Sequence, residues 1–315
     1  MSLTTMTEVA KIYNKIPAQV LENIINASGL LRTMNFDAAI AGEKDIYRTF
    51  DELPTATISQ FGAAIVPQSL TSANKELTLA YVTALQQELT DIVENATIDK
   101  SEYFRTRSTL YYEAIAQKLA KLFFYGSSYD ITSPFRGFKE IAETNSQTIV
   151  GNSSGSSAMS TIFAIRWKPQ YCTGLFNPQM MTKGMLVKSE WKHQGNSYTK
   201  TSNVSTGAEY DVFGMLHSAC LGVKVVSKDL VATYTKLDAS NLPTSDNMDK
   251  LCDMVKAEGG NTVLYMTRAM RRSLMTLKNT KLELINSDNG IDNRVEAWNG
   301  IPIMIDENLI DTEVN

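Results

Sequence analysis

The feature that most constrains the fold is a β-patterned excursion in the first third of the chain, which brings no apolar core of its own. Residues 44–50 (KDIYRTF) favour a strand, and residues 77–82 (LTLAYV) alternate apolar and small side chains as a returning strand does. Between them, residues 61–71 contain Gly62 and Pro67, which indicate a turn region. Because an isolated two-stranded hairpin is marginal in water, the excursion predicts a partner surface outside itself.

Residues 98–125 carry the clearest helical pattern. Asp99 or Ser101 can cap the start of this helix, and Gly126 follows its last turn, where glycine commonly ends a helix. A helix of this length spans roughly 40 Å. The apolar positions that broadly follow the helical period, and that we expect to pack on a sheet, are Tyr103, Leu110, Ala114, Leu119, Leu122 and Phe123.

The rest of the chain predicts an arm at one end and mixed strands and helices at the other. Residues 1–42 are modestly helical, and Gly29 breaks the helical pattern. Little here suggests a self-contained core, so the segment is either an arm that packs on another surface or a short first helical layer. From about residue 140 the pattern favours strands with Gly/Ser/Thr-rich joints, so the fold class is α+β. The expected strands are 161–167, 210–216, 221–226, 262–266 and 301–305, and the expected helices are 247–256 and 267–277.

Charge and cysteine content exclude several functional classes. The net charge of −4 argues against a free sequence-specific DNA binder, although a mildly acidic subunit can line a DNA container if its basic patches face inward. The three cysteines form no C-x-x-C pair, and an odd number argues against a disulfide framework. The N-terminus has no apolar segment typical of a secretory signal, and no apolar run approaches transmembrane length. We therefore expect a protein made and assembled in a cytosol.

Signals of catalysis are weak. The chain contains no G-x-G-x-x-G, Walker A, H-E-x-x-H or G-x-S-x-G motif. The acidic neighbours Asp51/Glu52 and Asp306/Glu307 are sequential, so they cannot share one face of a strand and are expected on the solvated surface. We expect His193 in a loop and Cys220 as a small core residue. The two histidines, His193 and His217, are too far apart for zinc-ligand spacing, so no catalytic, cofactor or metal site is predicted.

Four segments, in order along the chain, resemble the major capsid proteins of tailed bacteriophages. In residues 122–138 (LFFYGSSYDITSPFRGF) an aromatic residue and a glycine end the long helix, and a Phe-x-Gly turn closes a polar spacer. Residues 156–167 (SSAMSTIFAIRW), followed by a Gly-Leu-Phe turn, and residues 263–270 (VLYMTRAM) are the next two. Residues 299–313 end the series with a Gly-Ile-Pro-Ile strand. Residues 183–210 look idiosyncratic, and the resemblance assigns them no place.

This resemblance implies a Hong Kong 97-like capsid fold. It implies an N-terminal arm (1–42), an extended E-loop hairpin (43–97), a P-domain with the spine helix (98–140), a region that is mainly A-domain (141–285) and a C-terminal return strand (286–315). The function it implies is self-assembly into hexamers and pentamers of an icosahedral phage head that encloses double-stranded DNA. It further implies a virion protein assembled in the cytoplasm of a bacterial host, with portal, scaffold and decoration proteins as partners.

The expected helix 267–277 carries three arginines that lie largely off its apolar face, and no acid occurs from Gly259 to Lys281. One hypothesis is a solvated helix whose arginines pair with acids of neighbouring elements. The other is non-specific contact with DNA phosphates on the inner wall of the shell. The candidate phosphate contacts are Arg268, Arg271 and Arg272.

Three functions remain open from the sequence. The first is a phage coat protein without chemistry, the second is an encapsulin-type shell subunit of the same fold, and the third is a soluble α/β enzyme with an unrecognised site. The coreless hairpin and the arm argue against the enzyme, because both require a partner surface.

Overall fold

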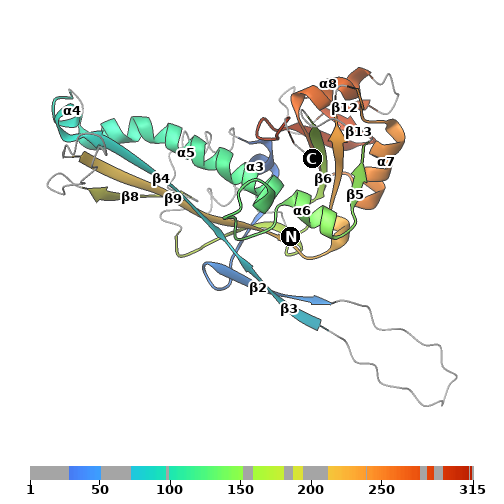
Figure 1. Cartoon of the computed structure of the whole chain (residues 1–315), viewed down its shortest axis with the longest axis horizontal. Coiled ribbons are helices and arrows are strands. Elements are labelled where there is room, and N and C mark those ends of the chain that lie inside the picture. The colour runs from blue at the N-terminus through green and yellow to red at the C-terminus, as the bar shows by residue number, and fades with distance from the viewer. Residues whose placement is uncertain are drawn as a thin grey trace, which may run out of the picture.

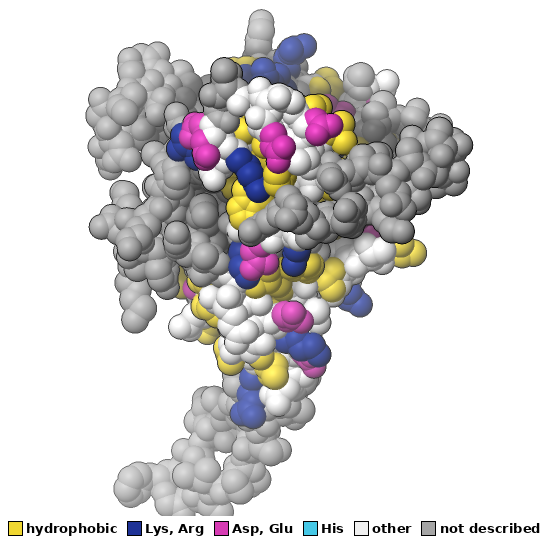
Figure 2. Space-filling model, turned by 90° about the vertical axis from the view of Figure 1, so that its left-hand side faces the viewer, with side chains coloured by type: hydrophobic (Ala, Val, Ile, Leu, Met, Phe, Trp, Pro, Cys, Tyr) yellow, Lys and Arg dark blue, Asp and Glu magenta, His cyan; other side chains and the backbone are white. Residues whose placement is uncertain are grey.

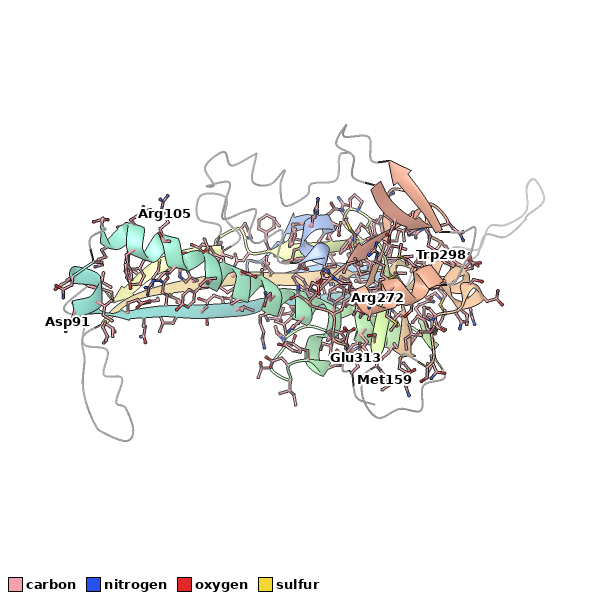
Figure 3. The ribbon with its side chains drawn as sticks, turned by 90° about the horizontal axis from the view of Figure 1, so that it is seen from above. Asp91, Arg105, Met159, Arg272, Trp298 and Glu313 are labelled. Carbon is pink, nitrogen blue, oxygen red and sulfur yellow. The ribbon has the colours of Figure 1, made fainter. Side chains whose placement is uncertain are left out.

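The computed structural model describes residues 28–50, 72–96, 99–151, 159–180, 187–193, 212–238, 240–276, 282–286, 294–311 and 313. They form an elongated half, in which a long helix lies on a sheet, and a rounded half built around a second sheet (Figure 1). A narrow two-stranded hairpin projects from the body between the two halves. In Figure 3, Asp91 and Arg105 mark the far end of the elongated half, and Trp298 and Arg272 lie in the rounded half. The mixture of helices and strands is the α+β class that the sequence predicts.

The long helix of the elongated half is α5 (Lys100–Tyr125), and it begins and ends where local signals place its termini. The Asp99 carboxylate accepts a hydrogen bond from the Ser101 amide at 3.0 Å, which satisfies one of the free N–H groups of the first turn. Gly126 follows with a φ of 56°, a conformation that glycine adopts without steric cost. A short helix, α4 (Thr90–Glu94), precedes α5, and the 3-10 turn η1 (Gly126–Ser128) follows it.

The buried face of α5 differs in part from the expected one. Tyr103, Leu119, Leu122 and Phe123 are buried as predicted. The prediction that Leu110 and Ala114 are buried is wrong, because Leu110 is 68% exposed and Ala114 is exposed as well. The buried positions at this part of the helix are instead Ser108, Tyr112, Ile115 and Ala116, which share one stripe at helical spacing.

A five-stranded sheet lies against α5. Its strands are β1 (Phe36–Ala38), β7 (Cys172–Phe176), β9 (Val212–Val225) and β4 (Ala80–Leu89) in spatial order, with β8 (Val187–His193) also pairing with β9. β1 and β7 are parallel, and the other pairs are antiparallel. The two strands expected at 210–216 and 221–226 are one 14-residue strand, β9. It remains continuous because β4 pairs with it along one edge, while β7 and β8 pair with successive parts of the other.

The rounded half is built on a seven-stranded sheet. In spatial order its strands are β12 (Leu282–Asn286), β13 (Arg294–Trp298), β14 (Ile301–Ile305), β11 (Thr262–Met266), β6 (Ser160–Arg166), β10 (Val231–Leu237) and β5 (Thr148–Val150). Its helices are α6 (Phe138–Thr144), α7 (Ser245–Met254) and α8 (Arg268–Thr276), with the 3-10 turn η2 (Lys228–Leu230) before β10. α7 buries the expected Met248, Leu251 and Cys252 against this sheet.

The predicted hairpin is present. β2 (Lys44–Phe50) and β3 (Ser72–Thr78) are antiparallel, from the pair Lys44–Thr78 to the pair Phe50–Ser72. Within the described residues these two strands pair only with each other. The returning strand expected at 77–82 is divided, because β3 ends at Thr78 and β4 begins at Ala80 within the sheet under α5.

The strands of residues 141–285 belong to both sheets, and Gly29 begins a helix. The strands of residues 141–285 are divided between the two sheets, since β7, β8 and β9 pair under α5, whereas β5, β6, β10 and β11 belong to the rounded half. Gly29 begins helix α3 (Gly29–Thr33) where the sequence suggested a break. A Cβ on Gly29 would lie 2.7 Å from the Ile305 carbonyl oxygen, so close backbone packing accounts for this glycine. Most of the expected arm, residues 1–27, lies outside the described residues.

Candidate functional site: the hairpin base and the arginine helix

A buried ion pair fixes the base of the hairpin. The Lys224 ammonium on β9 lies 2.8 Å from the Asp45 carboxylate on β2, and the two side chains are 14% and 2% exposed. Lys224 also lies 5.1 Å from the centre of the Tyr47 ring. Removing one partner of a buried pair leaves an uncompensated charge. The pair therefore holds the hairpin at a defined place on β9.

A groove of about 460 Å³ runs beside this base. It lies between the hairpin, the loop before α6, α6 itself and the end of β9, and its walls mix apolar and charged side chains. The lining residues are Tyr47, Lys75, Glu76, Leu77, Thr78, Pro134, Phe135, Arg136, Ile141, Thr144, Asn145, Val223 and Val225.

The sheet face that points away from α5 carries an exposed apolar row. Tyr81, Leu85 and Leu89 lie four residues apart on one face of β4, and their side chains are 57%, 44% and 40% exposed. Ile92 on α4 continues the row and is 51% exposed. Figure 2 shows apolar side chains among acidic and basic ones on this end of the molecule. Such a mixed surface is suited to contact with another protein chain.

On α8, two of the three candidate arginines pair with carboxylates of the same chain. The Arg268 Nε atom donates to Glu307 at 3.0 Å, and the Arg271 Nε atom donates to Glu296 at 2.5 Å. The hydrogen bond to Glu296 raises the pKa of Arg271. Arg272 is exposed, and no carboxylate among the described residues forms an ion pair with it. Glu296 and Glu307 come from β13 and from the turn after β14, so the sequence of the helix alone could not reveal these pairs.

Asp306 contradicts the expectation of a solvated surface residue. It is 1% exposed and accepts hydrogen bonds from the Ser28 hydroxyl at 2.6 Å, the Leu30 amide at 2.8 Å and the Asn308 amide at 2.9 Å. It thereby caps α3 from the opposite end of the chain. Its neighbour Glu307 is 67% exposed, as expected. The Asp-x-Asn turn was a local signal of side-chain bonding, but nothing local indicated Ser28 as a partner.

The C-terminal segment is fixed by a second buried carboxylate. Glu313 accepts hydrogen bonds from the Tyr125 hydroxyl at 3.0 Å, the Lys139 ammonium at 2.5 Å and the Thr161 hydroxyl at 2.9 Å. Its backbone forms an isolated β-bridge with Met159, and Figure 3 labels the two residues next to each other. These contacts join α5, α6 and β6, so the end of the chain closes the junction between the two halves.

His217 forms a buried network and not a catalytic centre. Its Nδ1 atom lies 2.8 Å from the Ser189 hydroxyl, and its Nε2 atom lies 3.1 Å from the Gln86 side-chain oxygen. Burial lowers the pKa of His217 to about 4, so the ring is neutral and donates from Nε2. In Ser-His-acid triads a carboxylate orients the histidine, whereas a neutral amide stands here and His217 is fully buried. The network serves packing between β4, β8 and β9.

The sequence also singled out Cys220, His193, Asp51 and Glu52. Cys220 is buried as expected. His193 ends strand β8, so its expected loop position is wrong. Asp51 and Glu52 lie outside the described residues. In the part of the chain that the structure describes, no group of three or more His, Cys, Asp or Glu side chains could hold a metal ion, and no helix is long and apolar enough to cross a membrane.

Comparisons with known proteins agree with this architecture. A sequence model of the family described as major capsid protein GP7 matches residues 13–315. The chain is similar to a chain in the structure of bacteriophage Epsilon15, with a TM-score of 0.58, 13% identity and coverage of 89% of this chain and 85% of that one. It is also similar to the bacteriophage JBD30 capsid, with a TM-score of 0.52, 12% identity and coverage of 88% and 89%. No curated protein sequence matches the chain.

The encapsulin alternative has a more remote counterpart. The encapsulin of Synechococcus elongatus matches with a TM-score of 0.46 and 11% identity, covering 68% of this chain and 90% of that one. A likeness this remote carries no functional argument.

Proposed function

Because the chain belongs to the major capsid protein GP7 family, we propose that it assembles into hexamers and pentamers of an icosahedral phage head that encloses double-stranded DNA. The observation that carries the proposal is the family match over residues 13–315. As a major capsid protein, the chain is a component of the phage virion. Its contribution is structural, and we propose that it performs no catalysis.

The hairpin supports the multimeric part of the proposal. It projects from the body (Figure 1), and Ile46 on β2 is 51% exposed. A two-stranded hairpin gains its stability by packing against a further surface. In a shell, the neighbouring subunit supplies that surface.

Assembly takes place in the cytoplasm of a bacterial host, and the partners are portal, scaffold and decoration proteins. The encapsulin alternative shares the fold, but the match to a phage capsid family favours the phage head over a protein compartment.

Electron microscopy of the purified protein tests this function. The subunit, expressed with the neighbouring head proteins of its phage, should form closed shells, and the filled ones should protect double-stranded DNA from nuclease. Monodisperse monomers under the same conditions would contradict the proposal.

For the DNA contact, Arg272 is the main candidate of the three arginines, because Arg268 and Arg271 already pair with carboxylates. Arg272→Gln should lower the thermal stability of DNA-filled particles relative to empty ones, and the difference should shrink as salt rises. Arg268→Gln on the same helix is the matched control, and its effect should be smaller. If DNA-filled and empty particles of Arg272→Gln differ in thermal stability as much as those of the unaltered chain, the contact is excluded.

A further inference from the structure

Several contacts restrain the loop that joins α5 to α6. Its two ends meet at Gly126 and Gly137, where a Cβ on Gly126 would lie 2.1 Å from the Gly137 nitrogen. Within the loop, the Asp130 carboxylate accepts hydrogen bonds from the Lys118 ammonium at 2.6 Å and from the Thr132 hydroxyl at 2.6 Å. The buried Phe135 anchors the far side of the loop against Phe123. These contacts hold the loop on both sides of its tip.

Ile131 at this tip is 92% exposed, which makes it the most exposed large apolar side chain among the described residues. Single exposed apolar side chains are common on protein surfaces, so exposure alone identifies no contact. The difference here is that Ile131 is held by a preorganised loop, so little conformational entropy is lost when a partner covers it.

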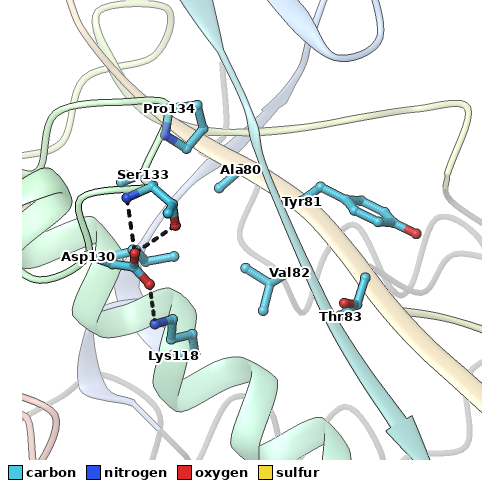
Figure 4. A pocket seen from close by; sticks show the side chains of 10 residues that line it. Ala80, Tyr81, Val82, Thr83, Lys118, Asp130, Ser133 and Pro134 are labelled. Atoms are coloured by element: carbon cyan, nitrogen blue, oxygen red, sulfur yellow. Dashed lines mark hydrogen bonds and ion pairs between the residues drawn. The ribbon is translucent and has the colours of Figure 1, made fainter.

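A hollow of about 360 Å³ lies beside the same loop. Figure 4 shows it between β4, α5 and the loop, with the Lys118–Asp130 ion pair at one wall. Its lining includes Val82, Lys118, Leu122, Asp130 and Thr132. Because a cavity of about 150 Å³ accommodates a benzene molecule, this hollow has room for an isoleucine side chain.

The position of Ile131 prevents it from filling the hollow of its own chain. Its neighbours Asp130 and Thr132 line the hollow, whereas Ile131 does not and remains open to solvent. A projection and a recess therefore lie side by side on one surface. In a twofold contact the same patch serves both partners, and adjacent complementary features of this kind suit that symmetry.

We propose that this surface is a self-complementary contact between two copies of the chain, in which Ile131 of each copy enters the hollow beside β4 of the other. The inference rests on the proposed function, since the contact joins neighbouring subunits of the shell. In Figure 4, Val82 points from β4 towards α5 and the loop, so its side chain faces the paired isoleucine.

Cysteine cross-linking in assembled shells tests the contact. Subunits with Ile131→Cys, carrying a size tag, are co-assembled with untagged Val82→Cys subunits and oxidised. The native cysteines are buried, so they do not interfere. Covalent dimers of one tagged and one untagged chain are expected. When one chain carries both substitutions, twofold symmetry limits the disulfide-linked products to dimers. Ladders of higher oligomers would overturn the twofold contact.

A charge substitution provides a second measurement that does not depend on disulfide geometry. Ile131→Asp should raise the subunit concentration at which shells first form by about tenfold or more, because the contact would then bury an unpaired carboxylate. Leu110→Asp, at a 68% exposed position on α5 outside the contact, is the matched control. An effect of Ile131→Asp no larger than that of the control overturns the inference. If the unaltered chain forms shells in these experiments, such a result counts against this contact alone and leaves the proposed function standing.

Discussion

At the scale of single residues, buried polar side chains join segments that are far apart in the sequence. Asp306 accepts hydrogen bonds from α3, and His217 links β8 to β4 through Ser189 and Gln86. Burying a polar group is costly unless its bonds are made. Each of these residues is therefore sensitive to changes in charge or in partner.

The pKa of His217 predicts an acid-sensitive subunit. The folded chain keeps this histidine neutral with a pKa of about 4, below its ordinary value of 6.5. As pH falls from 6.5 towards 4, the unfolded state binds a proton that the folded state does not, so the free energy of unfolding decreases over this window. The total loss is on the order of 3 kcal/mol. Urea unfolding of the unassembled subunit at several pH values measures it, and His217→Gln should flatten the dependence. If the free energy of unfolding of the variant depends on pH as steeply, other groups cause the pH dependence.

Asp306→Ala should lower the free energy of unfolding by about 2–4 kcal/mol, because the Ser28 hydroxyl and the Leu30 and Asn308 amides lose their buried acceptor. Denaturant unfolding of the unassembled subunit measures this loss. Glu307→Ala at the next, exposed position is the control and should change stability by less than about 1 kcal/mol. Similar losses for both variants would show that Asp306 has no special role in capping α3.

At the scale of elements, α5 depends on one buried stripe along its length. Leu119 is 2% exposed and lies in the main core, whereas Leu110 is 68% exposed. Leu119→Ala should lower the free energy of unfolding by about 2–5 kcal/mol. Leu110→Ala makes the same chemical change on the solvent side and should cost less than about 0.5 kcal/mol. Thermal unfolding of the two variants of the unassembled subunit checks the comparison, and equal losses would contradict the assigned faces.

At the scale of the whole molecule, one core extends from α5 into the rounded half and a second lies within the rounded half, while the described part of the hairpin has no core beyond its base. Amides of β2 and β3 should exchange with solvent rapidly in the unassembled subunit and slowly in the shell, because neighbours cover the hairpin there. Hydrogen exchange read by mass spectrometry measures both states. Amides of α5 serve as the internal reference, since one face of that helix packs against the core in a single subunit. Strong protection of the hairpin before assembly would contradict this expectation.

The sequence by itself determined the elements whose signals are local. Asp99 and Gly126 mark the two ends of α5, and the expected strands at 262–266 and 301–305 are β11 and β14 with the same bounds. Capping and apolar periodicity act between residues a few positions apart, so they can be read along the chain. The resemblance of short segments to phage capsid proteins also lay in the sequence.

Only the tertiary structure decided which surfaces meet. It joined the two strands expected at 210–216 and 221–226 into β9, buried Asp306 under α3, and turned Leu110 towards solvent. It also gave Arg268 and Arg271 partners on other elements. Each of these outcomes depends on residues tens to hundreds of positions away, because burial and ion pairing depend on distance in space, whereas the order of residues records only distance along the chain.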